Sequence, residues 1–199
     1  MRILIIGATG TIGHAVVAAL QPRNDLILAS RGKSAERVDL TDAASIRALY
    51  KRVGRVDAVV SVAGEAAYKP LNQLADEDFA FSIGSKLMGQ VNLVRHGTDA
   101  VTDGGSFTLT TGILATRPTP GGAAISMVNA GVDAFARAAA LELPRGIRIN
   151  TVSPPWVSET LVAMGRDPSG GLPAADVARS YVESVEGKQT GAVLTPKRR

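Results

Sequence analysis

The sequence predicts an α/β fold, a doubly wound parallel sheet of the Rossmann type in three layers. Short apolar segments of strand length alternate with helical segments along the whole chain of 199 residues. The first apolar segment also runs directly into the glycine-rich turn Gly7-Ala8-Thr9-Gly10-Thr11-Ile12-Gly13, which opens a helical segment. Such alternation places helices on both faces of the sheet, with ligands beyond the carboxyl ends of the strands. We expect residues 1–199 to form a single domain.

The first half of the chain contains four expected strands. Residues 2–6 are apolar and partly β-branched, and the helix that follows, 12–20, is stopped by Pro22. Further apolar runs predict strands at 26–30, 37–40 and 56–62, the last closed by Ala63-Gly64. Between the last two strands, a helix over 43–52 is expected to begin after Thr41, because threonine is a preferred helix cap.

The second half continues the alternation. A polar loop with Tyr68 leads into a long helical region over 73–100, which has one weak point near Gly84. Strands are expected at 107–111, 147–153 and 191–194, and helices at 122–143 and 174–186. The Gly/Pro-rich stretches 117–122 and 165–173 are expected to be loops over the ligand crevice.

Composition and charge narrow the class of protein. The chain has no cysteine and only two histidines, His14 and His96, so we expect no disulfide and no metal site. The surplus of four positive charges lies partly in the terminal run Lys197-Arg198-Arg199, a solvated tail rather than a nucleic-acid surface. No apolar stretch approaches the roughly 18 residues that span a bilayer. We expect a cytoplasmic protein with neither nucleic-acid nor membrane partners.

The glycine-rich turn predicts a dinucleotide site. Gly7 permits the tight turn, Gly10 lets the backbone approach a pyrophosphate, and Gly13 lets the helix lie close to the sheet. The free amide groups and the helix dipole then face the phosphate charge. We expect Thr9, Thr11 and Ile12 to belong to the same binding loop.

The end of the second strand predicts which dinucleotide is bound. It reads Ala29-Ser30-Arg31-Gly32-Lys33, which offers Ser30 and Arg31 to a 2′-phosphate where an NAD site would carry a carboxylate. This favours NADP(H) over NAD, although Arg31 and Lys33 could also be plain exposed loop cations. Asp39 would then accept a hydrogen bond from the adenine amino group.

The whole chain resembles the short-chain dehydrogenase/reductase family. The resemblance rests on the glycine-rich turn, on Val38-Asp39-Leu40, on Ser61-Val62-Ala63-Gly64 and on the segment Ile149-Asn150-Thr151-Val152-Ser153-Pro154. It implies strand order 3-2-1-4-5-6-7, an extended cofactor that also contacts Leu40, Ala63, Gly64 and Pro154, and homodimers or homotetramers built through the two long central helices. Family members transfer hydride between a nicotinamide and a carbonyl or alcohol.

The usual catalytic residues of that family are absent. Family spacing places the serine at Thr111, the tyrosine at Ala124, the lysine four residues later at Val128, and the asparagine at Lys86. Neither alanine nor valine moves a proton, so the standard acid/base mechanism is lost. The pattern is similar to a small subgroup that keeps the cofactor loop and lacks these residues.

Three side chains are candidates for a replacement. Lys86 would donate the proton or anchor the cofactor, Thr111 (or Thr110) would bind the substrate oxygen, and Tyr68 would add a hydroxyl, with Trp156 in an apolar wall. The alternative without a catalytic role is that Lys86 is an exposed cation on a helix face and that Tyr68 is a loop residue that packs its ring. Two functions therefore stay open: an NADP(H)-dependent oxidoreductase of a small or medium carbonyl or alcohol substrate, and a catalytically inactive dinucleotide-binding sensor or regulatory subunit that binds a small effector.

Overall fold

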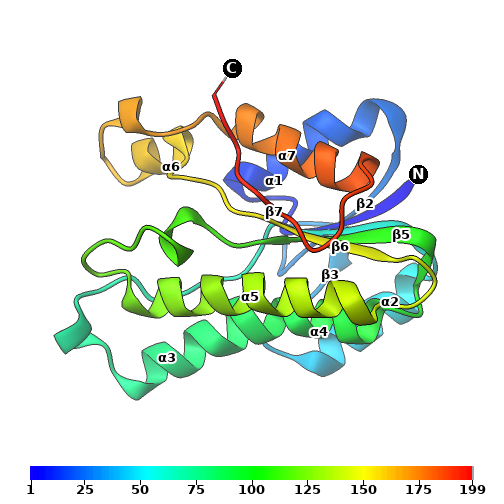
Figure 1. Ribbon diagram of the computed structural model, residues 1–199, viewed down its shortest axis with the longest axis horizontal. Coiled ribbons are helices and arrows are strands. Elements are labelled where there is room, and N and C mark those ends of the chain that lie inside the picture. Colours follow the sequence, from blue (N-terminus) through cyan, green and yellow to red (C-terminus); the bar gives the residue numbers. More distant parts are fainter. Residues whose placement is uncertain (199) are drawn as a thin grey trace.

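The chain folds around one seven-stranded parallel sheet. In a computed structural model, which describes residues 1–198, the strands lie in the order β3-β2-β1-β4-β5-β6-β7. Every neighbouring pair is parallel. Helices cover both faces, so the molecule has three layers (Figure 1). The predicted fold class and strand order are confirmed.

The strands and helices follow the predicted alternation. The strands are β1 (Arg2–Ile6), β2 (Asp25–Ser30), β3 (Glu36–Arg37), β4 (Val56–Ser61), β5 (Val101–Thr110), β6 (Arg148–Val152) and β7 (Val193–Leu194). The α-helices are α1 (Thr11–Leu20), α2 (Ala43–Val53), α3 (Asp76–Ser82), α4 (Gly89–Gly97), α5 (Ala123–Glu142), α6 (Ser158–Ala163) and α7 (Ala174–Glu186).

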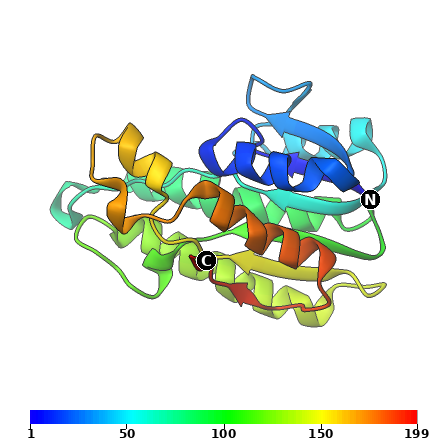
Figure 2. The same ribbon diagram turned by 90° about the horizontal axis from the view of Figure 1, so that it is seen from above.

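The two faces of the sheet bury two separate cores. Along β1, Leu4 and Ile6 pack into the core under α2, α4 and α5, whereas Ile3 and Ile5 pack into the core under α1 and α7. This alternation follows from the period of two along a strand, and it explains why β1 is apolar at successive positions. Seen from above, α1 and α7 lie next to each other over the sheet (Figure 2).

Two predicted boundaries in the first half are wrong. The third strand is Glu36–Arg37 rather than 37–40, because only these residues pair with β2, at Ala29 and Ser30. The cap of α2 is Asp42, whose Oδ1 accepts a hydrogen bond from the Ala44 N–H at 2.7 Å. The neighbouring Thr41 instead donates both its N–H and its hydroxyl to Asp39.

The helical region predicted over 73–100 is interrupted. Between α3 and α4, residues Ile83–Met88 form a π-helical segment, which includes the expected weak point at Gly84. In the second half, β5 is longer than expected and β7 is shorter, because only Val193–Leu194 pair with β6. The six-residue α6 is an additional helix that the sequence pattern did not predict. No side chain caps α6, so it has no helix-start signal to find.

The C-terminal run is only partly free. Lys197 and Arg198 are exposed, yet an Arg198 N–H donates to the Gly171 carbonyl at 2.7 Å, and Arg199 lies outside the described residues. Within residues 1–198, no helix has the length and apolar character needed to cross a bilayer. The same part of the chain holds no cluster of three or more carboxylate and imidazole side chains suited to a metal.

Candidate functional site

Two cavities lie at the carboxyl ends of the central strands. One, of about 340 Å³, is bordered by the glycine-rich loop after β1 and by the end of β2. The other, of about 320 Å³, is bordered by the segments after β5 and β6 and by α5. Both are lined by Val62, Ala63 and Gly64, the segment that follows β4. The cavities therefore form two halves of one groove, which we call the loop half and the Lys86 half.

The glycine-rich loop is held by close backbone contacts. Gly7 has a φ of +85°, and a Cβ there would lie 2.7 Å from the Val62 carbonyl oxygen. A Cβ on Gly13 would lie 2.1 Å from the Gly7 carbonyl oxygen, so only glycine lets α1 pack on this turn. No side chain caps α1, which leaves the amide groups of its first turn open to an anion. The cradle fits a dinucleotide pyrophosphate.

Most of the residues predicted to bind the cofactor meet along this groove. The loop half is lined by Gly7, Thr9, Gly10, Ser30, Arg31, Leu40, Ala63 and Gly64, and the Lys86 half by Ile12, Ala63, Gly64 and Pro154. Thr11 and Gly13 lie in the first turn of α1 behind the loop. Asp39 lines neither cavity. Hydrogen bonds from the Thr41 N–H and hydroxyl hold the pKa of the Asp39 carboxyl below its usual value.

An ion pair crosses the loop half. Arg31 Nη2 lies 3.3 Å from Glu65 Oε2, and both side chains line the cavity. The backbone of Glu65 is fixed, because its N–H donates to Ser85 Oγ at 3.0 Å. Arg31 is thus an exposed cation that contacts a carboxylate at the edge of the cavity. Sequence reasoning missed Glu65, since no motif marks an isolated glutamate after a glycine.

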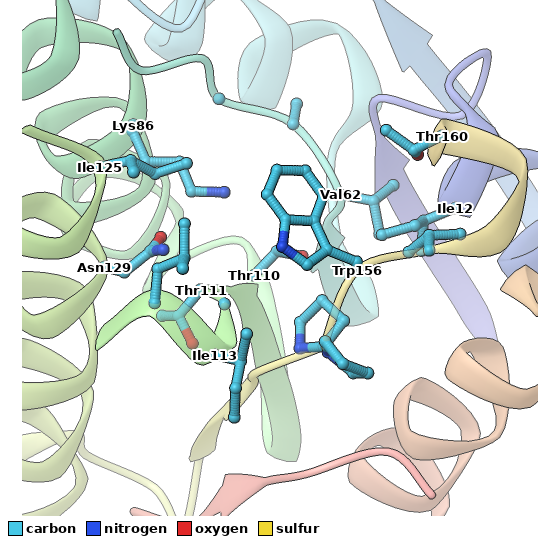
Figure 3. Close-up of a pocket in the computed structure, with 17 residues that line it drawn as sticks. Ile12, Val62, Lys86, Thr110, Thr111, Ile113, Ile125, Asn129, Trp156 and Thr160 are labelled. Atoms are coloured by element: carbon cyan, nitrogen blue, oxygen red, sulfur yellow. The ribbon is translucent and has the colours of Figure 1, made fainter. Parts of the chain in front are cut away.

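Lys86 lies in the wall of the other half. The π-helical segment that carries it leaves only 8% of the residue exposed, and Figure 3 shows its amine directed into the cavity. Desolvation lowers the pKa of Lys86 to about 8, and no charged neighbour contributes to the shift. The reading of Lys86 as an exposed helix-face cation is therefore wrong. A buried amine with this pKa can hold or give up a proton near neutral pH.

A buried network holds the Lys86 segment against the sheet. Gln90 Nε2 donates to the carbonyl oxygens of Lys86 at 3.1 Å and Thr110 at 2.8 Å, and Gln90 Oε1 accepts from the Thr110 N–H at 2.8 Å. The Thr110 hydroxyl is engaged by the Ser61 carbonyl at 2.5 Å and the Tyr181 hydroxyl at 2.6 Å. Burial raises the pKa of Tyr181, so its hydroxyl stays protonated. Its hydrogen bond with Thr110 links α7 to β5.

Of the other two catalytic candidates, Thr111 lines the cavity and Tyr68 does not. Thr111 lines the cavity, but its hydroxyl donates to the Val152 carbonyl at 3.4 Å, and Figure 3 shows its oxygen turned away from the Lys86 amine. Tyr68 is not among the residues that line the cavity. Its hydroxyl contacts Thr119 Oγ1 at 3.1 Å and the Pro120 carbonyl at 3.2 Å, and its ring packs edge-on against Trp156. This placement suits packing better than proton transfer.

The face of α5 that reaches the cavity differs from the expected one. Ala124 and Val128 are fully buried and do not line it, whereas the next residues, Ile125 and Asn129, do. Assigning the tyrosine and lysine positions to Ala124 and Val128 is therefore wrong by one residue along the helix, because spacing alone does not determine which face meets the groove. Ile125 is as unable as Ala124 to move a proton. Asn129 is buried, and its Oδ1 has no hydrogen-bond partner.

The remaining wall of the cavity is apolar. Trp156 lies among the other lining residues, on the opposite side of the cavity from Asn129 (Figure 3). The Arg166 guanidinium lies over the Trp156 ring, 5.3 Å from the ring centroid. Apolar residues from five segments make up most of the lining: Ile12, Val62, Ile113, Leu114, Ile125, Pro154, Pro155 and Val157. Within residues 1–198, Lys86 is the only charged side chain among those that line this cavity. The site combines one ammonium, one carboxamide and threonine hydroxyls in apolar surroundings.

Comparison with known proteins agrees with this architecture. The family described as enoyl-(acyl carrier protein) reductase matches residues 12–190, most of the chain. The chain belongs to the short-chain dehydrogenase/reductase family, a family of oxidoreductases. It is 29% identical over 154 residues to a hydroxynaphthalene reductase of Aspergillus fumigatus, covering 75% of this chain and 56% of that protein. It is also 30% identical over 136 residues to an uncharacterized NAD-dependent oxidoreductase of Mycobacterium tuberculosis, covering 64% of this chain and 50% of that one.

Solved structures of this family share the complete fold. A protein of Listeria innocua is 47% identical and superposes with a TM-score of 0.95, covering 98% of both chains. A small-chain dehydrogenase in complex with NADPH is 24% identical and superposes with a TM-score of 0.87, covering 98% of this chain and 95% of that one. The chain therefore has nearly the length of these structures, but it spans only about half the length of the two relatives above.

Proposed function

We propose that this short-chain dehydrogenase/reductase is an NADP(H)-dependent oxidoreductase of a small or medium carbonyl or alcohol substrate, acting as a single domain. The glycine-rich loop, with its close contacts at Gly7 and Gly13 and the open first turn of α1, would hold the pyrophosphate. The nicotinamide end would then lie in the Lys86 half of the groove. Bound there, the nicotinamide would supply or accept the hydride.

The observation that carries the proposal is the buried amine of Lys86. Because its ammonium is desolvated and points into the cavity, it would donate a hydrogen bond to the carbonyl oxygen of a substrate. As the oxygen gains electron density, the Lys86 proton would pass to it, which a pKa near 8 permits. Gln90 would keep the amine in place by binding the Lys86 carbonyl. Thr111, whose own proton is donated to Val152, would only accept a hydrogen bond.

Ser30 and Arg31 support the choice of NADP(H), since both line the loop half and a guanidinium binds a 2′-phosphate well. Binding would require Arg31 to leave Glu65 or to contact both groups. The NADPH complex of the structural neighbour is consistent with this choice, while the relative described as NAD-dependent makes a comparison of both dinucleotides necessary.

We further propose that the protein is cytoplasmic and forms homodimers or homotetramers through α4 and α5. Met127 and Leu141 support the second point, because both are exposed apolar side chains on α5. Light scattering after size-exclusion chromatography would measure the mass. A monomer at micromolar concentration would contradict the proposed assembly.

The function is tested by measuring NADPH binding and NADPH oxidation with a panel of aldehydes, ketones and quinones. We expect turnover with part of the panel, and a loss of about 100-fold or more in kcat/KM in Lys86→Met, with binding of NADPH retained. Lys51→Met, which removes an exposed lysine of α2, is the control and should change neither. Tight NADPH binding without turnover on the whole panel would favour the sensor or regulatory subunit instead.

A further inference from the structure

The Lys86 amine has no partner within the protein and is directed into the cavity. Among residues 1–198, its Nζ atom makes no hydrogen bond and no ion pair, and Figure 3 shows it pointing into the cavity. It differs in this respect from Asn129 Oδ1, which also lacks a partner but is enclosed by protein atoms. Of these two groups, only the amine is open to a ligand.

Packing fixes the direction from which the amine enters the cavity. The side chain lies against Gly64, where a Cβ would come within 3.1 Å of both Lys86 Cα and Lys86 Cδ. The Lys86 carbonyl accepts a hydrogen bond from Gln90 Nε2 at 3.1 Å, and the neighbouring Ser85 Oγ accepts one from the Glu65 N–H at 3.0 Å. The stem of the lysine is therefore held in place, while the amine at its end is not bonded.

The amine can act as a nucleophile near neutral pH. Desolvation lowers the pKa of Lys86 from the usual 10.5 to about 8, and within residues 1–198 no carboxylate lines the cavity to hold the proton. The charged side chains on adjoining segments, Glu65 and Arg166, contact Arg31 and Trp156 instead. At pH 7, about one Lys86 amine in ten is then unprotonated, against fewer than about one in a thousand at a pKa of 10.5. An unprotonated lysine amine attacks carbonyl carbons.

The lining of the cavity favours an apolar carbonyl compound. The volume of about 320 Å³ admits a small molecule, and apolar side chains such as Ile113, Ile125 and Trp156 form most of the wall. The hydroxyls of Thr110 and Thr111 are already bonded to the protein. Such a wall holds little of the water that would hydrolyse an imine, so a carbonyl compound bound here would stay joined to the amine.

We propose that Lys86 is an imine-forming lysine, whose Nζ adds to the carbonyl carbon of a small apolar aldehyde or ketone in the dinucleotide-free protein. A carbon–nitrogen bond forms, the carbon–oxygen bond breaks, and the oxygen leaves as water with the two protons of the neutral amine. Nothing is oxidised or reduced, so the step needs no co-reactant. This activity goes beyond the proposed function, in which Lys86 forms no covalent bond with the substrate and only passes a proton to it.

Reductive trapping tests the proposal on the full-length protein. Benzaldehyde is added at pH 7 without dinucleotide, and cyanoborohydride reduces each imine to a stable benzylamine, which adds one benzyl group to the mass. Peptide mass spectrometry then gives the rate of labelling at each amine. We expect Lys86 to be labelled about tenfold faster than the exposed Lys51, because its larger unprotonated fraction outweighs the weaker nucleophilicity of a less basic amine.

Binding in the cavity gives a second readout. Labelling of Lys86 should level off as the benzaldehyde concentration rises, because the aldehyde occupies the cavity before it reacts. Labelling of Lys51 and of the Met1 α-amine should instead rise in proportion to the concentration. Lys86→Met and Lys86→Arg should both remove the fast label, and Lys86→Arg does so while it keeps the positive charge. Lys51→Met is the matched control and should leave the label at Lys86 unchanged.

Two results would overturn the inference. One is a rate of labelling at Lys86 no faster than at Lys51. The other is a rate at Lys86 that rises in proportion to benzaldehyde without levelling off, which would mean that the aldehyde reacts directly from solution. If neither Lys86 variant folds, the peptide map of the wild type alone decides between these outcomes. Failure of the proposed function is distinct, because it is seen as a wild type that binds no NADPH, while the labelling is measured without dinucleotide.

Discussion

The two halves of the groove are built in different ways. In the loop half, the decisive contacts come from backbone atoms within a few residues of each other, such as Gly13 against the Gly7 carbonyl. In the Lys86 half, they come from single side chains on separate elements, such as Lys86 on the π-helical segment and Asn129 on α5. A nucleotide phosphate can be held by backbone alone, whereas a reacting oxygen needs particular side chains. The first half is therefore determined locally and the second by the assembled fold.

The largest predicted effect on stability is that of Gly13→Ala, which tests whether backbone packing determines the loop half. In an exposed helix, glycine to alanine would gain roughly 1 kcal/mol, but here the added Cβ would lie 2.1 Å from a carbonyl oxygen. We expect Gly13→Ala to lower the free energy of unfolding by about 3 kcal/mol and to abolish NADPH binding. Gly32→Ala, with nothing within 4 Å of the added carbon, should change the free energy of unfolding by less than about 1 kcal/mol. Urea denaturation measures both, and equal effects would mean that backbone packing does not govern the loop half.

The second prediction concerns the Lys86 half, and the expected change in the free energy of unfolding is smaller. The pKa of Lys86 is about 8 in the folded protein and about 10.5 when exposed. Between these values the unfolded chain binds the proton that the folded protein has released, so stability must rise with pH. We expect the free energy of unfolding to increase by about 2 kcal/mol from pH 8 to pH 10. Above pH 10 the gain reverses, because burial raises the pKa values of Tyr50 and Tyr181, and these residues ionise only after unfolding.

Urea denaturation at several pH values tests this dependence against Lys86→Met. The variant should be more stable than the wild type at pH 7, and its stability should stay flat from pH 8 to pH 10. The exposed-lysine variant Lys51→Met should retain the wild-type slope. If the free energy of unfolding changes with pH in the same way in Lys86→Met and in the wild type, Lys86 is solvated in the folded protein. The Lys86 half would then not differ from the loop half by holding a desolvated charge.

The smallest effect is expected from the ion pair in the loop half. Arg31 and Glu65 are 67% and 62% exposed, so their interaction is worth less than about 1 kcal/mol. Removing the carboxylate would free Arg31 for a 2′-phosphate. We expect Glu65→Gln to tighten NADPH binding two- to fourfold and to leave NADH unchanged or slightly weaker, as measured by calorimetry. Glu77→Gln on α3 is the control, and a Glu65→Gln variant that affects both dinucleotides equally would show that the pair does not select between them.

The sequence was most informative where neighbours along the chain decide the structure. The strand β1, the glycine-rich loop and the helices α1 and α7 follow from local patterns and agree with the structure to within a residue. Errors occurred where competing local signals were close together. Thr41 and Asp42 are both good caps, and only the fold decides that Thr41 donates to Asp39 while Asp42 caps α2. The pairing that limits β3 to two residues is likewise a contact between distant segments.

The Lys86 half was harder to predict for the same reason. Lys86 was identified by its position in the chain, but its burial depends on Gly64, where a Cβ would lie 3.1 Å from the lysine Cα. The residues of α5 that face the cavity, Ile125 and Asn129, depend on the rotation of the helix, and a count along the chain missed them by one position. Glu65 gains its importance only because the fold brings it to Arg31.

The segment Val62–Gly64 borders both cavities, and this has a thermodynamic consequence. Gly64 has a φ of +113° and packs against Lys86, while Val62 packs against Gly7 of the phosphate loop. A ligand that shifts this backbone from one side changes the shape met by a ligand on the other side. Any such coupling is reciprocal: if the dinucleotide strengthens substrate binding by some factor, substrate strengthens dinucleotide binding by the same factor. The shared wall thus provides a direct physical route for cooperativity between the two binding events.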